Sequence, residues 1–187
     1  ESVMMPTGVY LVIGFIIAAT MSLLLTPAVK AIAFKIGAVD RPNARKVHTR
    51  IMPRLGGLAI YAAFATGLAA LLPFLPDAML GGYDKRFIAA LLAGGTIIVL
   101  IGALDDRFEL SAKVKLLGQI AAASVVVFGF GIRIDLLNIP FGESMQPVAE
   151  WLAIPLTILW IVGCTNAINL IDGLDGLAAG VSGIAIA

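Results

Sequence analysis

Long apolar runs separated by short polar segments dominate this sequence of 187 residues. The complete runs cover residues 9–25, 55–75, 87–104, 116–132 and 148–165, and a sixth run covers residues 177–187. A helix needs roughly 20 mostly apolar residues to cross the hydrocarbon core of a bilayer. Only helices and closed barrels can satisfy their backbone hydrogen bonds there. The pattern therefore predicts an all-α integral membrane protein, a helical bundle with five complete spans and the start of a sixth.

The composition favours the same class. Apolar residues make up 60% of the chain and charged residues 13%, and the mean hydropathy is +1.01. A soluble domain carries about 25% charged residues. The single cysteine, Cys164, excludes an internal disulfide framework. Membrane lipids are expected partners, and nucleic acid is not.

The sixth run is too short to cross the hydrocarbon core at about 1.5 Å per residue. The chain also begins with Glu1 rather than with Met. Both features predict that residues 1–187 are the N-terminal part of a single polytopic domain in a longer protein.

Lysine and arginine gather in alternate loops. Three lie in the loops after the second and fourth spans, namely Lys85, Arg86 and Arg133. Ten lie in the loops after the first and third spans, namely Lys30, Lys35, Arg41, Arg45, Lys46, Arg50, Arg54, Arg107, Lys113 and Lys115. Because cytoplasmic loops carry the excess of these residues, the N-terminus is predicted to lie outside. Loops 26–54, 105–115 and 166–176 are then cytoplasmic.

Amide and carboxylate side chains recur at a spacing of three in one of these loops, as Asn166, Asn169, Asp172 and Asp175. Side chains three apart share a face of a helix or tight helical turn, so the four can converge on one ligand. The alternative is a structural cap with hydrogen bonds between helices. An EF-hand is disfavoured, because its alternating ligands and late Glu are missing.

Two adjacent carboxylates, Asp105 and Asp106, follow the third span. Near a low dielectric such a pair needs a cation, a nearby Lys or Arg, or a shared proton. Mg²⁺ suits the pair, because it binds carboxylates together with substrate phosphates, and Mn²⁺ is the alternative. Lys115 in the same loop is placed to bind a phosphate. A plain juxtamembrane turn would also explain the two acids.

The third motif is a basic segment, Arg45-Lys-Val-His-Thr-Arg-Ile-Met-Pro-Arg-Leu-Gly-Gly57. Its glycine pair permits close backbone approach, and its charges suit a nucleotide diphosphate, lipid headgroups or a lipid phosphate. Ordinary positive-inside topology explains the charge as well. All three motifs fall on the predicted cytoplasmic side, which favours one composite site.

Together, the three motifs closely resemble those of the polyprenyl-phosphate N-acetylhexosamine-1-phosphate transferases. The basic segment, Leu104-Asp-Asp-Arg-Phe-Glu-Leu-Ser-Ala-Lys-Val-Lys115 and Asn166-Ala-Ile-Asn-Leu-Ile-Asp-Gly-Leu-Asp-Gly-Leu-Ala178 are most similar to the bacterial undecaprenyl-phosphate N-acetylglucosamine-1-phosphate transferases. These enzymes initiate envelope polymers such as teichoic acid and O-antigen. The resemblance implies transfer of the sugar phosphate from a UDP-N-acetylhexosamine to undecaprenyl phosphate, with release of UMP. It also implies Mg²⁺ as cofactor and a cytoplasmic active site in the bacterial plasma membrane.

The resemblance further implies roles for individual residues. Asp105 and Asp106 are the catalytic candidates, and Asp105 would engage the lipid phosphate as a base or orienting group, or, in an older view, as a nucleophile. Asp106 and Asp172 are the candidate metal ligands. The candidates for binding phosphate, nucleotide and diphosphate are Lys115, Asn169, Asp172, Asp175, Lys46 and Arg54.

Several alternatives stay open. A phospho-N-acetylmuramoyl-pentapeptide transferase is the related one, although its basic segment differs around the proline and glycine pair. A transporter would place acids near the membrane midplane, whereas here they lie at the ends of spans. A lipid-binding scaffold would tolerate Asp105→Asn.

In this family a further acidic metal-binding position and a His-rich loop would lie beyond residue 187, so we expect residues 1–187 alone to be inactive. The sequence leaves open the choice of N-acetylhexosamine and the downstream polymer. It also leaves open the oligomeric state, with a homodimer among the options.

Overall fold

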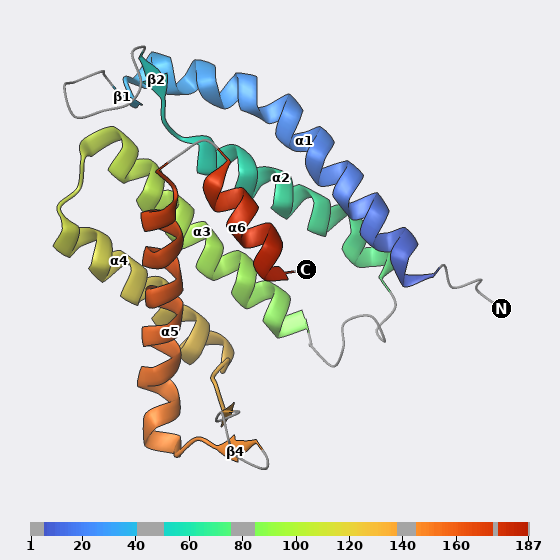
Figure 1. Ribbon diagram of the computed structural model, residues 1–187, viewed down its shortest axis with the longest axis vertical. Coiled ribbons are helices and arrows are strands. Elements are labelled where there is room, and N and C mark those ends of the chain that lie inside the picture. The colour runs from blue at the N-terminus through green and yellow to red at the C-terminus, as the bar shows by residue number, and fades with distance from the viewer. Residues whose placement is uncertain (1–5, 41–50, 76–84, 138–144, 174–175, 187) are drawn as a thin grey trace. The chain divides into compact units, whose positions relative to one another are not determined.

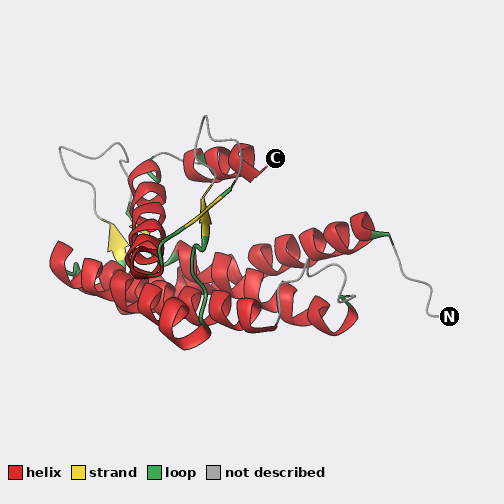
Figure 2. Cartoon of the chain, turned by 90° about the horizontal axis from the view of Figure 1, so that it is seen from below, coloured by secondary structure: helices red, strands yellow, loops and turns green. Residues whose placement is uncertain are grey.

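The computed structural model describes residues 6–40, 51–75, 85–137, 145–173 and 176–186, and most of them are helical (Figures 1 and 2). The helices are α1 (Thr7–Ile36), α2 (Gly56–Leu71), α3 (Lys85–Phe108), α4 (Ala112–Ser124), α5 (Glu150–Ile171) and α6 (Leu177–Ile186). Two short antiparallel ribbons pair β1 (Val39–Asp40) with β2 (Met52–Pro53), and β3 (Leu136–Leu137) with β4 (Gln146–Pro147). The chain divides into two compact units, residues 1–115 and 116–187.

The prediction of an all-α membrane protein is confirmed. Within the described part of the chain, five helical segments are long and apolar enough to cross a membrane, namely Gly8–Ile36, Gly56–Phe74, Arg86–Phe108, Ala112–Gly129 and Glu150–Ile171. Many of their large side chains point outward, among them Leu23, Trp151 and Leu159, which are 77%, 78% and 69% exposed. Such surfaces suit lipid chains rather than water.

Small residues hold α1 and α2 together in the first unit. Ala59, Ala63 and Gly67 are buried and follow one another at a spacing of four along α2. A Cβ at Gly67 would lie 3.7 Å from Ala18 of α1. Residues without bulk let two membrane helices approach closely, so that dispersion contacts replace contacts with lipid.

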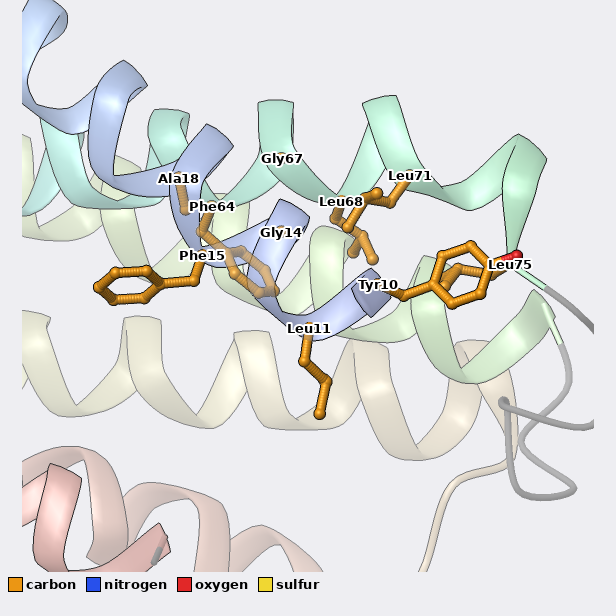
Figure 3. Close-up of a pocket in the computed structure, with 10 residues that line it drawn as sticks. All are labelled: Tyr10, Leu11, Gly14, Phe15, Ala18, Phe64, Gly67, Leu68, Leu71 and Leu75. Carbon is orange, nitrogen blue, oxygen red and sulfur yellow. The ribbon is translucent and has the colours of Figure 1, made fainter. Parts of the chain in front are cut away.

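An apolar groove of about 360 Å³ lies along the same helix pair (Figure 3). Its lining includes Tyr10 and Phe15 from α1, and Phe64 and Leu71 from α2. An apolar lining is what a membrane helix pair needs where it faces lipid chains.

A tyrosine joins α2 to α3. The Tyr61 hydroxyl donates to the carbonyl of Leu92 at 2.6 Å and lies 2.7 Å from the hydroxyl of Thr96. Gly95 makes room for the ring, because a Cβ there would lie 2.8 Å from Tyr61 Cε2. A polar group between apolar helices is thereby satisfied within the protein.

Helix α1 extends beyond the predicted span, since the segment expected as a loop from residue 26 is helical as far as Ile36. Pro27 lies within the helix without ending it. In the added turns, Val29 and Ala33 pack on Leu55 and Ala59 in a small buried cluster. Lys30 and Lys35, expected in a loop, lie exposed on this part of the helix, where packing of other residues stabilises the added turns.

Helices α3 and α5 also run past the predicted ends of their spans. Asp105 and Asp106 lie in the last turns of α3, and Asn166 and Asn169 lie on α5, although loops 105–115 and 166–176 were expected there. Hydropathy marks where lipid contact ends, whereas backbone hydrogen bonding decides where a helix ends.

In the second unit, α4 continues into a π-helical stretch, Val125–Gly129. A buried threonine then fixes the chain that follows, because Thr157 Oγ1 accepts the Ile134 N–H at 2.9 Å and donates to the Ala153 carbonyl at 2.6 Å. In the connection, Arg133 pairs with Asp135 at 2.8 Å and approaches Glu150, the first residue of α5, at 3.6 Å. These contacts join the connection between α4 and α5 to the first turns of α5.

Candidate active site

The two adjacent carboxylates lie where α3 ends. Glu109 has a φ of 51°, in the left-handed region, and its N–H donates to the Asp105 carbonyl at 2.8 Å. A left-handed residue directly after a helix is a common way to end it. Three residues later, α4 begins at Ala112. Both carboxylates therefore stand at a turn between two apolar helices.

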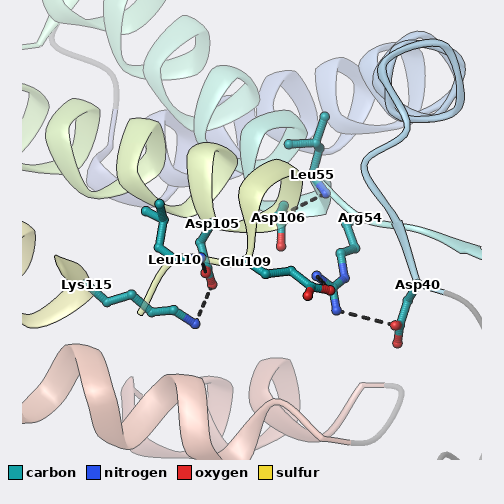
Figure 4. A network of polar contacts seen from close by, with 8 residues as sticks. All are labelled: Asp40, Arg54, Leu55, Asp105, Asp106, Glu109, Leu110 and Lys115. Carbon is teal, nitrogen blue, oxygen red and sulfur yellow. Dashed lines mark hydrogen bonds and ion pairs between the residues drawn. The ribbon is translucent and has the colours of Figure 1, made fainter. Parts of the chain in front are cut away.

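Asp105 uses both of its carboxylate oxygens in this turn. Oδ1 accepts the Leu110 N–H at 2.9 Å, and Oδ2 lies 2.7 Å from Lys115 Nζ (Figure 4). The backbone N–H of Lys115 donates to the Ser111 carbonyl at 3.1 Å in the first turn of α4. Asp105 thus holds the ammonium group of Lys115 at the turn. The side chains of both residues are partly shielded from water.

Asp106 has a different environment. Its Oδ2 accepts the N–H of Leu55 at 2.9 Å. Leu55 has a φ of 72° and immediately precedes α2. Among the described residues, Asp106 Oδ1 has no hydrogen bond or ion pair. One carboxylate oxygen therefore holds the start of α2, while the other is open to a ligand.

Arg54 lies between two acids beside this pair. Its backbone N–H donates to the Ala38 carbonyl at 3.0 Å, which extends the β1–β2 ribbon by one bond. One guanidinium nitrogen lies 3.3 Å from Asp40 Oδ1, and another lies 3.9 Å from Glu109 Oε1. The Asp40 side chain is 20% exposed and that of Glu109 is 83% exposed, so Asp40 is the firmer partner.

These side chains surround a polar pocket of about 320 Å³, lined by Arg54, Asp105, Asp106, Glu109, Leu110 and Lys115. Figure 4 shows the carboxylates and the two cations gathered around it. Alternating charges of this kind can hold a phosphate through Arg and Lys, and a divalent cation through Asp. Within the described ranges, no group of three or more His, Cys, Asp or Glu could hold a metal ion unaided. A metal bound here needs ligands from elsewhere.

The second unit contains Asn169 and Asp172. Asn169 is exposed in the last turn of α5. Asp172 is the residue at which the helix ends, exposed and with its N–H donating to the Ile168 carbonyl at 3.1 Å. Asn166 differs from both, because its amide is hydrogen-bonded to Gln119. Two further candidates, Lys46 and Asp175, lie outside the described residues.

Sequence reasoning missed Asp40 and Glu109. Both are acids that flank a basic or acidic motif, and only the folded chain shows that they meet Arg54. At the glycine pair, a Cβ at Gly56 or Gly57 would meet no described atom within 4 Å, so close approach there stays a prediction about a ligand. The left-handed residue is their neighbour Leu55, a conformation that a sequence pattern does not predict for leucine.

The sequence around this pocket is similar to that of a known protein family. Residues 88–187 match the model of glycosyl transferase family 4, which is more than half of the chain. The chain belongs to this family. The predicted resemblance is thereby confirmed, and the matched range includes Asp105, Asp106, Lys115, Asn169 and Asp172.

Curated relatives of this family 4 chain carry specific names. A Bacillus subtilis (strain 168) protein named probable undecaprenyl-phosphate N-acetylglucosaminyl 1-phosphate transferase is 48% identical over 176 residues, covering 94% of this chain and 46% of the relative. A decaprenyl-phosphate N-acetylglucosaminephosphotransferase of Mycolicibacterium smegmatis is 41% identical, covering 88% and 40%. The undecaprenyl-phosphate alpha-N-acetylglucosaminyl 1-phosphate transferase of Escherichia coli K12 is 35% identical, covering 84% and 40%. The chain spans less than half the length of these relatives.

Proposed function

We propose that the complete protein transfers N-acetylglucosamine-1-phosphate from its UDP derivative to undecaprenyl phosphate and releases UMP. The names of the relatives support this reaction. The main structural support is the polar pocket at the ends of apolar helices. In this pocket Asp105 is paired with Lys115, and Asp106 and Arg54 add one negative and one positive charge. A lipid acceptor that carries a phosphate calls for a polar site beside the membrane.

The reaction joins two phosphates. An oxygen of the lipid phosphate attacks the β-phosphorus of the UDP-sugar, the bond from that phosphorus to the bridging oxygen breaks, and the oxygen leaves with UMP. A phosphate monoester with a second pKa of about 6 is mostly dianionic at neutral pH, so it needs little help in losing a proton. Positioning and charge neutralisation are then the main tasks of the protein.

Asp105 fits an orienting role in this scheme. Both of its oxygens are engaged, one by a backbone N–H and one by Lys115. It would hold the ammonium toward the phosphates, while Arg54 neutralises charge from the other side of the pocket. As a general base, the carboxylate would have to accept the proton at a lone pair that neither the Leu110 N–H nor Lys115 occupies.

The cofactor in this proposal is Mg²⁺, with Mn²⁺ as the alternative. A hard carboxylate oxygen such as the open Oδ1 of Asp106 is the type of ligand Mg²⁺ prefers, and Mg²⁺ usually takes only one or two carboxylates beside phosphates and water. When bound, it would neutralise charge on the diphosphate. Asp172 is proposed as a second ligand, and Asn169, Asp175 and Lys46 as contacts to the UDP-sugar.

The proposed location is the plasma membrane of a bacterium, with the active site on the cytoplasmic side. Ten of the 13 Lys and Arg residues of this multi-pass chain follow the first and third spans, which favours that orientation. The UDP-sugar would then reach the pocket from the cytoplasm.

The test is a transfer assay with the complete gene product in nanodiscs, UDP-N-acetylglucosamine with a labelled sugar phosphate, and undecaprenyl phosphate. Mg²⁺-dependent formation of labelled lipid and UMP is expected. Transfer only from UDP-N-acetylmuramoyl-pentapeptide would assign the related reaction instead. A folded protein that transfers from no UDP-sugar would refute the proposal and favour transport.

A further inference from the structure

The carboxamides of Gln119 and Asn166 form a closed pair between α4 and α5, inside the second unit. Asn166 Nδ2 donates to Gln119 Oε1 at 2.7 Å, and Gln119 Nε2 donates back to Asn166 Oδ1 at 3.3 Å. Asn166 Nδ2 also donates to the Val162 carbonyl of its own helix at 2.8 Å. The Asn166 side chain is therefore engaged both within α5 and across to α4.

Both amides lie in apolar stretches of the sequence. Gln119 follows Leu116 and Leu117 on α4, and Asn166 lies five positions before Ile171, where α5 ends, or roughly 8 Å along the helix at 1.5 Å per residue. An amide facing lipid without a partner is strongly unfavourable, whereas a reciprocal pair satisfies both groups. The two amides therefore favour one rotation of α5 about its axis and one position of α5 along that axis relative to α4.

We propose that Gln119 and Asn166 are positioning residues for the UDP-sugar, an inference that rests on the proposed function. Asn169 follows Asn166 by three positions and shares its face of α5, and Asp172 follows by six. A slide or rotation of α5 on α4 would carry both of these residues with it. In this proposal Asn166 does not contact the ligand, although its spacing grouped it with Asn169, Asp172 and Asp175. It acts through the positions of Asn169 and Asp172.

A double-mutant cycle tests this inference in the complete gene product in nanodiscs, with Gln119→Met, Asn166→Leu and the double variant. Calorimetric binding of UDP reports on the pocket without turnover, and the transfer assay gives KM and kcat. Each single substitution should weaken UDP binding and raise the KM for the UDP-sugar by roughly 3- to 20-fold, the effect of losing one interhelical hydrogen bond. The KM for undecaprenyl phosphate should stay unchanged. The second substitution should add little, because the partner is already lost.

Two controls separate positioning from general stability. Thr165→Val removes a hydroxyl that donates within α5 to the Ile161 carbonyl, and it should leave UDP binding unchanged. The exchanged pair, Gln119→Asn with Asn166→Gln, keeps both amides and should restore most of the binding. Unfolding temperatures of all variants are measured alongside.

Additive effects in the cycle, unchanged UDP binding in both single variants, or an equal loss in Thr165→Val would each overturn the inference. A wild type that binds UDP but transfers no sugar phosphate would refute the proposed function alone, and the cycle would still decide the inference. A wild type that fails to bind UDP would refute both.

Discussion

Lys115 Nζ lies 2.7 Å from Asp105 Oδ2, and the same carboxylate accepts the Leu110 N–H through its other oxygen. One side chain thus stabilises the turn between α3 and α4 and holds a cation in the polar pocket. Hydrogen bonds to a charged group are stronger than neutral ones. The local fold and the candidate chemistry therefore depend on the same residue, which guides the choice of substitutions.

Asp105→Asn should lower kcat by on the order of 10²-fold, because it removes the charge that holds Lys115 and so misplaces a group that positions the substrate phosphates. Asn keeps an acceptor for the Leu110 N–H but loses the charge that holds Lys115, so the fold should survive. Labelled-lipid formation and the unfolding temperature are measured together. Near-normal transfer by the variant would indicate a binding scaffold rather than a catalytic site.

Lys115→Met should raise the KM of the phosphate substrates by roughly 10- to 100-fold, because a hydrogen bond to a charged group contributes ~1.5–3 kcal/mol. Lys113→Met is the matched control, since Lys113 is exposed on the same first turns of α4 but does not line the pocket. Initial rates against each substrate distinguish the two variants. Equal increases in KM for Lys115→Met and Lys113→Met would mean that Lys115 acts through the overall positive potential of the loop and not through a contact in the pocket.

Asp106→Asn should raise the Mg²⁺ concentration needed for half-maximal transfer. Asn can still accept the Leu55 N–H, so the start of α2 stays in place, but it is a weaker ligand for a hard cation than a carboxylate. Chelation by EDTA should abolish transfer by the wild type, and Mg²⁺ or Mn²⁺ should restore it. A variant with an unaltered Mg²⁺ dependence would remove Asp106 from the proposed metal ligands.

Asp40→Asn should impair transfer more than Glu109→Gln. Both acids approach Arg54, but Asp40 is closer and better shielded from water, and exposed ion pairs contribute only ~0–1 kcal/mol. Kinetics of both variants and of Arg54→Lys are compared. We expect Lys at position 54 to substitute poorly, because it lacks the planar fork that meets two carboxylates. The reverse order of Asp40 and Glu109 would show that the geometry around Arg54 differs when substrate is bound.

Gly95→Ala should destabilise the first unit by about 1–3 kcal/mol, because the added methyl group overlaps the Tyr61 ring. Gly102→Ala on the same helix is the matched control, since its Cβ would meet no atom within 4 Å and alanine favours a helix. Unfolding in detergent micelles measures both. A loss of stability at Gly102 that equals the loss at Gly95 would show that helix packing is not the cause.

Hydropathy alone was enough to predict the class of fold and the approximate centre of each membrane helix, because lipid contact imposes apolar side chains over about 20 residues. It did not predict that α1 continues to Ile36, since those turns are stabilised by packing of Val29 and Ala33. The acid motifs could be found from spacing and charge. The two acids that approach Arg54, Asp40 and Glu109, could not be found this way, because each lies outside the spacing that marks a motif and only the folded chain brings it to Arg54.

Spacing also predicted that Asn166 and Asn169 share a helical face, and the structure places both on α5. The same argument could not say which of the two amides pairs with another helix. That choice depends on Gln119, 47 positions away in sequence. A single sequence does not show which side chain on another helix is the hydrogen-bond partner.

Leu55 belongs at once to the buried cluster and to the acid pair, through its side chain and its N–H respectively. During evolution, the residues of the polar pocket and those that pack α1 on α2 therefore cannot change independently of each other. A bulkier residue in place of Ala33 or Ala59 would push on Leu55 and so displace the carboxylate of Asp106. Related chains that enlarge one of these alanines should therefore carry a compensating smaller residue at the position of Leu55.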